Sequence, residues 1–287
     1  MPELPEVETI RRDLATKLVR KKITDVVVRK DKIVRGSTEK FKKELVGKTF
    51  WKIDRRGKLL IFDITRTDTF LLVHLKMTGQ LIYQARGKRV AGGHPWPALD
   101  VKLPDKHTHI IITFADKSKL YFNDLRQFGF MQLVDEKQKD LVIAKFGIEP
   151  LTKDFTKDNF SKIFKNRRAP LKAVLLNQNL IAGLGNIYAD EICFAAGVRP
   201  TRRVDRLTKA EIDRLYGATE QVIRCAIKYR GTTFSNYVDA RGESGNFVAK
   251  LMVYGRGGEN CRKCNQFKIK KIKSAGRGTH YCPGCQK

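Results

Sequence analysis

The first residues of the chain, Met-Pro-Glu-Leu-Pro-Glu, contain groups suited to covalent catalysis. Proline at position 2 is small enough to permit removal of the initiator methionine, so we expect the mature chain to begin at Pro2. Because α-amino groups titrate near about 8, part of this secondary amine is unprotonated and nucleophilic at neutral pH. Attack on a sugar C1′ would give a charged iminium, which activates the neighbouring C–H bond for elimination. Glu3 or Glu6 would suit the proton transfers; the alternative is a rigid, acidic lead-in to a helix.

Four of the six cysteines form two Cys-x-x-Cys pairs, Cys261 with Cys264 and Cys282 with Cys285, separated by 17 residues. Two such pairs bring four thiolates to the corners of a tetrahedron, the arrangement that structural zinc prefers. Zinc would also supply folding free energy that so small a module lacks. We therefore predict one structural Zn²⁺. The alternatives are four unrelated buried cysteines and a redox pair, which is disfavoured because no βαβ pattern surrounds either pair.

Two further segments indicate contacts with phosphate. From Cys261 to its last residue the sequence carries eight Lys and Arg and no acidic residue, so the hairpin expected there should face phosphate or simply be a solvated basic surface. Gly183 and Gly185 immediately precede a helix predicted to begin at Asn186. Glycine lets backbone N–H groups approach an anion and a helix N-terminus favours one, although a plain interhelical turn has the same composition.

The overall composition indicates a nucleic-acid partner. The 287 residues include 58 Lys and Arg against 30 Asp and Glu, a formal net charge of +28. Each phosphate neutralised by such a protein releases counterions; simple solubility and attraction to an anionic membrane surface are the alternatives. With 41% hydrophobic residues the chain can bury a core. Its acidic start does not suit a signal peptide, and no stretch approaches the ~20 apolar residues that span a bilayer, so we expect a soluble, intracellular protein.

The elements that must position these groups begin with a helix predicted from Pro5 to about Lys17, which has one apolar face. Short apolar runs then predict strands at residues 58–64, 70–77, 80–84, 111–116 and 119–125. Closely spaced strands of this kind suggest a sandwich or a barrel-like pair of sheets. Residues 86–106, rich in Gly, Pro and Lys, are expected to form an exposed loop.

Helices are predicted again in the second half of the chain. The first covers residues 169–178, and the second covers 186–196 and ends at a glycine. The third begins after Thr208 and ends near Gly231, because Thr208 and Glu211 form a capping box. Short strand-like pieces and the cysteines follow.

Long segments of the sequence resemble the formamidopyrimidine-DNA glycosylases, bacterial enzymes that remove 8-oxoguanine and ring-opened purines. The likeness runs through the chain in the family's order: MPELPEVETIRR (1–12), RRGKLLIF (55–62), HLKMTGQL (74–81), DLRQFG (124–129), IEPL (148–151), AGLGNIYADE (182–191), VYGRGGENC (253–261) and GRGTHYCPGCQK (276–287).

This resemblance implies an α+β multidomain fold. We expect an N-terminal catalytic β-sandwich with a leading helix at residues 1–135, followed by a linker at 136–150. A helical DNA-binding domain with a helix–two-turn–helix motif and a lesion loop would occupy 151–246, and a zinc-finger β-hairpin 247–287.

The resemblance also implies a reaction: base excision from duplex DNA, followed by abasic-site cleavage through β,δ-elimination. Pro2 resembles the Schiff-base nucleophile and Glu3 the acid–base group at the deoxyribose ring. Glu6 is similar to a supporting carboxylate near the lesion, and Lys58 to a lysine that reaches the damaged nucleotide and its phosphate.

The DNA contacts come from the same resemblance. Arg277, which we group with the catalytic residues, and Asn186 are similar to two donors that grip the phosphates flanking the lesion, and Lys58, His74 and Tyr254 join them. An enzyme that acts on a base inside a duplex must flip it out, and other groups must fill the gap.

Met77, Arg126 and Phe128 resemble the residues that enter the duplex at that point. Met and Phe would wedge into the stack while Arg reads the orphan base. Periodicity alone would instead make Met77 and Phe128 core residues of two strands. Residues 231–247 correspond to the family's flexible lesion-contacting loop.

The sequence departs from the family pattern in three places. The loop at 86–106 is longer than usual, the spacer between the cysteine pairs has one extra residue, and Gln127 stands where the family commonly has Arg or Lys. The last change would alter phosphate contact near the wedge.

Two other functions remain open. An endonuclease VIII-like enzyme would use the same proline on oxidised pyrimidines, but that branch typically begins PEGPE. A non-catalytic zinc-finger protein that binds damaged DNA would suit the basic charge, but not the combination of Pro2, Glu3 and Lys58. The favoured interpretation is a monomeric bacterial repair enzyme, cytoplasmic and nucleoid-associated, whose partner is double-stranded DNA with damaged bases and which does not bind membranes.

Overall fold

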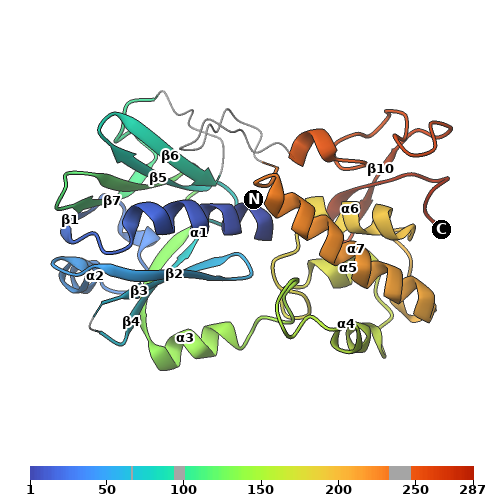
Figure 1. Cartoon of the computed structure of the whole chain (residues 1–287), viewed down its shortest axis with the longest axis horizontal. Coiled ribbons are helices and arrows are strands. Elements are labelled where there is room, and N and C mark those ends of the chain that lie inside the picture. Colours follow the sequence, from blue (N-terminus) through green and yellow to red (C-terminus); the bar gives the residue numbers. More distant parts are fainter. Residues whose placement is uncertain (66, 94–100, 233–246) are drawn as a thin grey trace. The chain divides into compact units, whose positions relative to one another are not determined.

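The structure, a computed structural model, describes residues 1–65, 67–93, 101–232 and 247–287 (Figure 1). The described chain divides into two compact units: Met1–Ala144 with residues 230–232, and Lys145–Tyr229 with Phe247–Lys287. No helix within these ranges is both long and apolar enough to cross a membrane.

The first unit contains, in order, α1 (Leu4–Leu18), β1 (Ile23–Val28), η1 (Asp31–Ile33), α2 (Thr38–Leu45), β2 (Phe50–Arg56), β3 (Leu59–Ile64), β4 (Thr69–His74), β5 (Gly79–Ala85), β6 (Lys88–Gly93), β7 (Thr108–Phe114), β8 (Lys119–Asp124), β9 (Phe130–Asp135) and α3 (Glu136–Ile143). The second contains α4 (Lys157–Phe164), α5 (Leu171–Leu176), α6 (Asn186–Ala196), η2 (Val204–Arg206), α7 (Lys209–Lys228), η3 (Phe247–Lys250), β10 (Lys270–Ser274) and β11 (Arg277–Tyr281).

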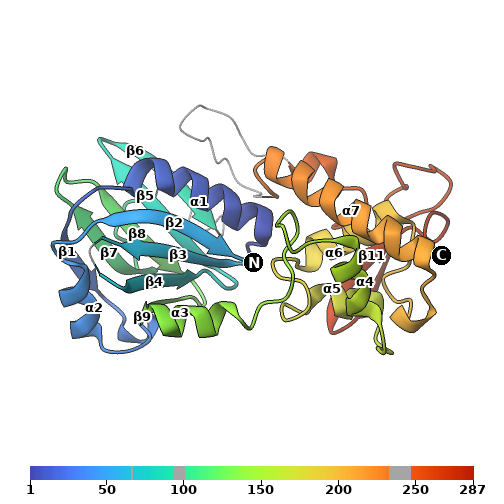
Figure 2. The ribbon, with the colours of Figure 1, turned by 60° about the horizontal axis from the view of Figure 1, so that its bottom comes forward.

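Two antiparallel sheets form the first unit, with strand orders β1-β7-β8-β5-β6 and β2-β3-β4-β9 (Figure 2). Their facing side chains make one hydrophobic core, in which the ring of Phe50 on β2 lies 6.5 Å from that of Phe114 on β7. Helix α1 packs against β2 and β6, the edge strands on one side of the two sheets. This arrangement confirms the predicted α+β fold with an N-terminal pair of sheets.

Helix α1 begins where its sequence predicts. A capping box joins Glu3 and Glu6, and Pro5 occupies the first turn, where its missing N–H costs no hydrogen bond. Val7, Ile10, Leu14 and Leu18 are buried along one face. Burial of this face on the edges of both sheets fixes the first turn of the helix, which carries the candidate catalytic residues.

The expectation of an exposed loop at 86–106 is wrong over its first part. Strand β6 pairs with β5 there, and Val90 and Ala91 are buried. Gly92 and Gly93 are typical of a loop in sequence, but a Cβ on Gly92 would lie 2.2 Å from Cγ1 of Ile10. The glycine is therefore required because α1 crosses the strand at that point. Residues 94–100 lie outside the described residues.

Several short elements escaped the sequence prediction: β1, β2, β6, β9, α2, α3 and α4. In β2 a bulge between Phe50 and Lys52 breaks the alternation, so that buried Phe50 and Ile53 are three residues apart. Helix α3 buries none of its residues and therefore has no apolar period to detect. Its start is fixed instead by a capping box between Asp135 and Gln138.

The second unit is mainly helical. Helix α6 contacts α5, α7 and β11 and buries most of its length, including Tyr188. It covers the predicted residues and ends at Gly197, whose φ of 71° is left-handed. Helix α7 begins after the Thr208–Glu211 capping box, as predicted, and ends earlier than expected, at Lys228. Helix α5 is shorter than predicted because Pro170 precedes it and the chain leaves helical geometry at Asn177.

The Glu8 carboxylate joins α1 to the turn between β2 and β3, and its loss should lower stability. It accepts hydrogen bonds from Arg11, Arg12 and Arg55, and although burial opposes the shift, these arginines lower the pKa of Glu8 from 4.5 to about 2. We expect Glu8→Gln to lower the free energy of unfolding by about 1–2 kcal/mol at pH 7, since hydrogen bonds to charged groups contribute but the site is partly exposed. Because the folded-state pKa is depressed, this contribution is present above pH 4.5 and is lost as the pH falls toward 2.

Urea denaturation of both proteins between pH 7 and pH 2.5 tests this expectation. The difference between wild type and Glu8→Gln should be largest near neutrality and should shrink below pH 4.5. Glu39→Gln is the matched control, because Glu39 is exposed and pairs only with its own helix, so it should change stability by less than about 0.5 kcal/mol. An unchanged difference down to pH 2.5 would refute the assignment.

Candidate functional site

The amino terminus lies beside two carboxylates and a lysine. Pro2, Glu3 and Lys58 are buried, with Glu3 only 3% and Lys58 5% exposed. Burial lowers the pKa of the terminal amine, Lys58 lowers it further, and Glu3 and Glu6 act in the opposite direction. Removal of Met1 would place the amine on Pro2, one residue closer to α1. The structure thus brings the four residues predicted for the reaction around one nitrogen.

Glu6 joins the first turn of α1 to residue 232 through hydrogen bonds that the sequence did not predict. Its Oε2 accepts the N–H of Glu3 at 2.9 Å. Its Oε1 accepts the N–H and the hydroxyl of Thr232 at 2.7 and 3.0 Å. Gly231 has a φ of 83°, and a Cβ there would lie 2.6 Å from Oε1 of Glu6. One carboxylate therefore ties the first turn of α1 to the start of the 231–247 segment, whose residues 233–246 lie outside the described ones.

Lys58 lies at the turn between β2 and β3. Gly57 takes a left-handed φ of 56°, so the chain turns sharply before Lys58. Arg55 donates to the carbonyl oxygen of Gly57 at 2.9 Å and to Glu8 at 3.2 Å. Glu8 thereby anchors the turn that presents Lys58, a role that the sequence did not indicate.

His74 ends β4 beside β3, where it is opposite Leu59. Burial, together with the nearby charges of Lys76, Lys58 and Arg35, lowers the pKa of His74 to about 3, so the ring is neutral at pH 7. Nδ1 accepts the N–H of Lys76 at 3.0 Å, which places the ring proton on Nε2. His74 can therefore act as a neutral donor to an anion.

Met77, Arg126 and Phe128 lie on two turns of the first unit. Met77 is half-buried in the turn after β4, and Arg126 and Phe128 follow β8. The Phe128 side chain is 53% exposed, so it is not a core residue. The guanidinium of Arg126 lies 4.7 Å from the centroid of the Phe128 ring. An exposed aromatic side chain stacked on an arginine is typical of a surface that contacts bases or aromatic groups.

In the second unit, Asn186 and the residues around Arg277 are in direct contact. Asn186 is the first residue of α6, and its Nδ2 donates to the carbonyl oxygen of Gly278 at 3.1 Å. The same oxygen accepts a hydrogen bond from Nζ of Lys172 at 2.9 Å. Arg277 precedes Gly278 at the start of β11 and is exposed. The structure therefore places the two predicted phosphate contacts next to each other.

A buried ion pair supports this contact. Lys172 and Asp190 are fully buried, with Nζ and Oδ1 2.6 Å apart. Oδ2 of Asp190 accepts the backbone N–H of His280 on β11 at 2.8 Å. Removing one partner of such a pair would leave an uncompensated buried charge, so α5, α6 and the hairpin are held together as one body.

Tyr254 is held by the residue next to Asp190. The carboxylate of Glu191 accepts the backbone N–H groups of residues 252, 253 and 254, each at 2.9 Å. Burial raises the pKa of Glu191 although these three donors act in the opposite direction. The ring of Tyr254 lies edge-on to His280 at 5.2 Å. Tyr254 thus lies beside the hairpin, half-buried.

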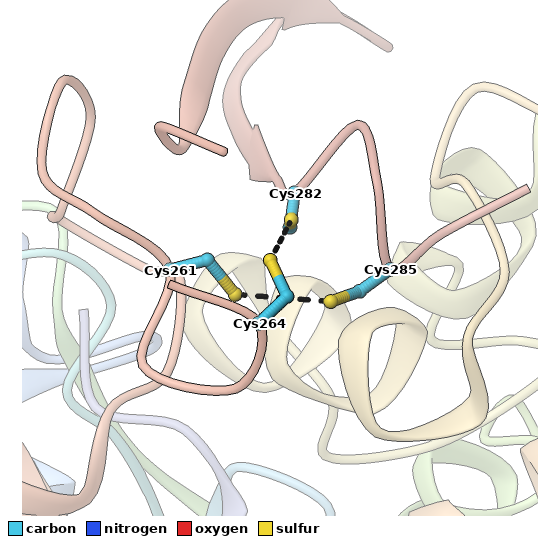
Figure 3. A group of neighbouring side chains, drawn as sticks. All are labelled: Cys261, Cys264, Cys282 and Cys285. Carbon is cyan, nitrogen blue, oxygen red and sulfur yellow. Dashed lines mark hydrogen bonds between the residues drawn. The ribbon is translucent and has the colours of Figure 1, made fainter. Parts of the chain in front are cut away.

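The four cysteines converge at one point (Figure 3), where their sulfur atoms all lie within 4.8 Å of one another. The Sγ–Sγ distances are 3.8 Å for Cys261 and Cys285 and 3.8 Å for Cys264 and Cys282. A tetrahedron with Zn–S bonds of about 2.3 Å has edges of about 3.8 Å. Four thiolates this close repel one another, so a cation is needed to hold them together. The cluster fits a tetrahedral metal ion.

Several residues that shape these sites were missed by the sequence prediction: Glu8, Thr78, Asp124, Lys172, Asp190 and Glu191. All are buried polar or charged residues that hold a turn or a loop. Acidic residues inside the family-like segments were the available signal, but the backbone groups that they bind are distant in sequence.

Comparison with known proteins agrees with this geometry. The family model described as the formamidopyrimidine-DNA glycosylase N-terminal domain matches residues 1–131, and that described as the H2TH domain of the same family matches 146–238. Formamidopyrimidine-DNA glycosylases of Desulfitobacterium hafniense and Carboxydothermus hydrogenoformans are 40% and 42% identical, with all of each chain covered. Among solved structures, a Lactococcus lactis Fpg mutant with THF-containing DNA matches with a TM-score of 0.88, 37% identity and full coverage of both chains.

The Lactococcus lactis Fpg in complex with DNA containing an abasic site gives a TM-score of 0.87, with 37% identity over 99% of each chain. Together, the matched models, the full-length relatives and the shared fold leave one assignment. The chain belongs to the formamidopyrimidine-DNA glycosylase family.

Proposed function

We propose that the chain is a base-excision-repair DNA glycosylase that removes oxidised and ring-opened purines from duplex DNA and then cleaves the abasic site. The observation that carries this proposal is the buried amino terminus beside Glu3, Glu6 and Lys58. Solved complexes of the Lactococcus lactis relative contain Fapy-dG DNA and abasic-site DNA, which supports the purine substrate and the lyase step. We also propose that the protein acts as a monomer, close to the nucleoid in the cytoplasm.

The chemistry would begin with the unprotonated secondary amine of Pro2. Its nitrogen attacks C1′, and the base leaves with the electron pair of the glycosidic bond and takes up a proton. The nitrogen then loses its proton, and the C1′–O4′ bond opens as O4′ is protonated, which leaves an iminium between the nitrogen and C1′. The resulting iminium withdraws electrons, so a C2′ proton is lost and the 3′ phosphate departs; a second elimination releases the 5′ phosphate. Glu3 is placed to move protons at the deoxyribose. Burial, with a smaller contribution from Lys58, lowers the pKa of the terminal amine of Met1, and the same surroundings would act on Pro2. Lys58 would also offer a cation to the phosphate.

The DNA contacts are assigned by chemistry. Asn186 and Arg277, joined through the backbone at Gly278, would grip phosphates, with Tyr254 beside them. His74 would donate to a further phosphate as a neutral ring. Met77, Arg126 and Phe128 would fill the gap left by the flipped nucleotide.

Oxidised pyrimidines are a second candidate substrate class. One solved complex of the Lactococcus lactis Fpg, 37% identical to this chain, contains oxidised-pyrimidine DNA. The amine attacks the sugar rather than the base, so the same amine would serve both substrate classes. We propose purines as the principal lesion and treat pyrimidine excision as the measured comparison.

We further propose that Cys261, Cys264, Cys282 and Cys285 hold one structural Zn²⁺. The sulfur geometry fits the ion, and Cys261 and Cys282 are fully buried. When bound, the ion would supply cross-linking of the hairpin rather than chemistry, since all four positions are filled by protein.

Borohydride trapping tests the nucleophile. On a duplex with 8-oxoguanine opposite cytosine, the mature protein should form a covalent adduct, because the reductant fixes the iminium. A protein with one extra retained residue before Pro2 should bind the same 8-oxoguanine duplex but form no adduct, since its proline nitrogen is then an amide. An adduct with the extended protein would overturn the assignment. The same assay on a duplex that contains thymine glycol measures the excision of oxidised pyrimidines.

Metal analysis tests the cluster. We expect about one zinc per folded chain. Cys285→Ser should lower the zinc content and weaken duplex binding, because the hairpin that carries Arg277 loses its cross-link. Cys225→Ser is the matched control, since Cys225 is half-buried on α7 outside the cluster and should retain zinc. Active, folded wild-type protein without zinc would contradict the proposal.

A further inference from the structure

We propose that Asp124, acting with Thr78, is a positioning residue that locks the Met77 turn and the 125–129 loop into one rigid unit. This inference rests on the proposed function, in which Met77, Arg126 and Phe128 fill the gap beside a flipped nucleotide. Asp124 does not touch DNA in this proposal. It holds the backbone from which the inserted side chains project.

The two turns start from directly opposite residues. Strand β8 ends at Asp124, strand β5 begins at Gly79, and these residues are paired in the antiparallel register. The Met77 turn therefore leaves the sheet beside the loop that carries Arg126 and Phe128. Sheet pairing alone brings the two turns together but does not fix their conformations beyond the last paired residues.

The Asp124 carboxylate supplies that fixation. It is fully buried, with 0% of the residue exposed. Oδ1 accepts the hydroxyl of Thr78 and the backbone N–H of Arg126, the latter at 3.2 Å. Oδ2 accepts the backbone N–H of Gly129 at 2.7 Å. One side chain thus binds the start and the end of the 125–129 loop and a residue of the neighbouring turn.

Thr78 closes the connection between the turns. Its hydroxyl donates to Asp124 and accepts the N–H of Arg126 at 2.9 Å, so the same N–H is shared between Thr78 and Asp124. Thr78 is 6% exposed and directly follows Met77. In addition, His109 donates from Nε2 to the carbonyl oxygen of Asp124 at 2.8 Å. The polar network is buried and linked, which is the condition under which such networks give rigidity.

The side chains that would enter the duplex have little packing of their own. Arg126 is exposed and Phe128 is 53% exposed, and Leu125 beside them in the same loop is 41% exposed, so buried contacts do not hold these two side chains. Gln127 between them has a φ of 57°, a left-handed conformation that a non-glycine residue keeps only when its surroundings impose it. Their direction therefore depends on the backbone, and the backbone depends on Asp124.

The physical consequence is a smaller loss of conformational entropy when these side chains fill the gap left by the flipped nucleotide. Side chains that are already placed lose little conformational entropy when they enter the stack. In Asp124→Asn, an amide N–H₂ would replace one carboxylate oxygen and face a backbone N–H donor. The loop would then lose an anchor while the sheet stays paired.

The experiment compares two reactions of each variant. Base release is measured in single turnover on an 8-oxoguanine·cytosine duplex, which requires extrusion of a stacked base. Borohydride trapping is measured on a duplex with a preformed abasic site, where no base has to be extruded. We expect Asp124→Asn and Thr78→Val to slow base release by about tenfold or more, because small misplacements of positioned groups cost rate, and to change trapping by less than about threefold. Thr78→Ser, which keeps the hydroxyl, should restore base release.

A second readout concerns the orphan base. If Arg126 is no longer held, the ratio of base-release rates opposite cytosine and opposite adenine should shrink in Asp124→Asn. Thr219→Val is the matched control for loss of a buried threonine hydroxyl, since Thr219 donates only within α7. It should leave both reactions and this ratio unchanged.

The outcomes distinguish a failure of the proposed function from a failure of the positioning role of Asp124 and Thr78. Wild-type protein that neither releases 8-oxoguanine nor traps abasic DNA would overturn the proposed function. Active wild type with equal losses of base release and trapping in Thr78→Val would show a general structural role and overturn the positioning role. Unchanged base release in both Asp124→Asn and Thr78→Val would overturn it as well. If Asp124→Asn fails to fold, the Thr78→Val and Thr78→Ser pair still decides the question.

Discussion

The proposed nucleophile, the amine of Pro2, would be covalently connected on one side only once Met1 is removed, and this constraint gives the first unit its importance. Pro2 can be held only through the residues that follow it. Helix α1 meets that requirement because its apolar face is buried against β2 and β6, the edge strands of two different sheets. The Glu3–Glu6 capping box then fixes the first turn, and Glu6 extends the same hydrogen-bond network to Thr232. The remaining groups of the site depend on this placement, because Lys58 lowers the pKa of the terminal amine only while the amine stays beside it.

Buried carboxylates that bind backbone N–H groups recur through the molecule. Glu6 holds residue 232, Asp124 holds the loop after β8, Asp190 holds the hairpin, and Glu191 holds residues 252–254. Two of these segments also carry exposed side chains, namely Phe128 in the loop that Asp124 holds and Arg277 in the hairpin that Asp190 holds. In a chain with 58 basic and 30 acidic residues, this use of acids inside leaves the surface free to attract phosphate. Fold stability and DNA recognition are therefore linked through the same few carboxylates.

The sequence by itself determined the features that depend on neighbouring residues. Helix α6 and the start of α7 follow from caps and a 3.6-residue period, and the double Cys-x-x-Cys spacing predicts the cluster of four cysteines that the structure contains. The resemblance of long segments identified the family and predicted Pro2, Lys58 and Asn186 as site residues. These signals are local, so they survive without knowledge of the fold.

Only the tertiary structure decided how the functional side chains are held. In sequence Gly92 is typical of a loop, but in the structure it lies in a strand directly against Ile10 of α1. In sequence Asp124 is an ordinary acid at a strand end, but in the structure it accepts hydrogen bonds from Thr78 and Gly129. Glu6, expected from the sequence as a supporting carboxylate near the lesion, also links α1 to Thr232 in the structure. The physical reason is that a buried charge must be satisfied by whichever donors the fold brings to it. Those donors lie up to 226 residues away in sequence, where no local pattern can indicate them.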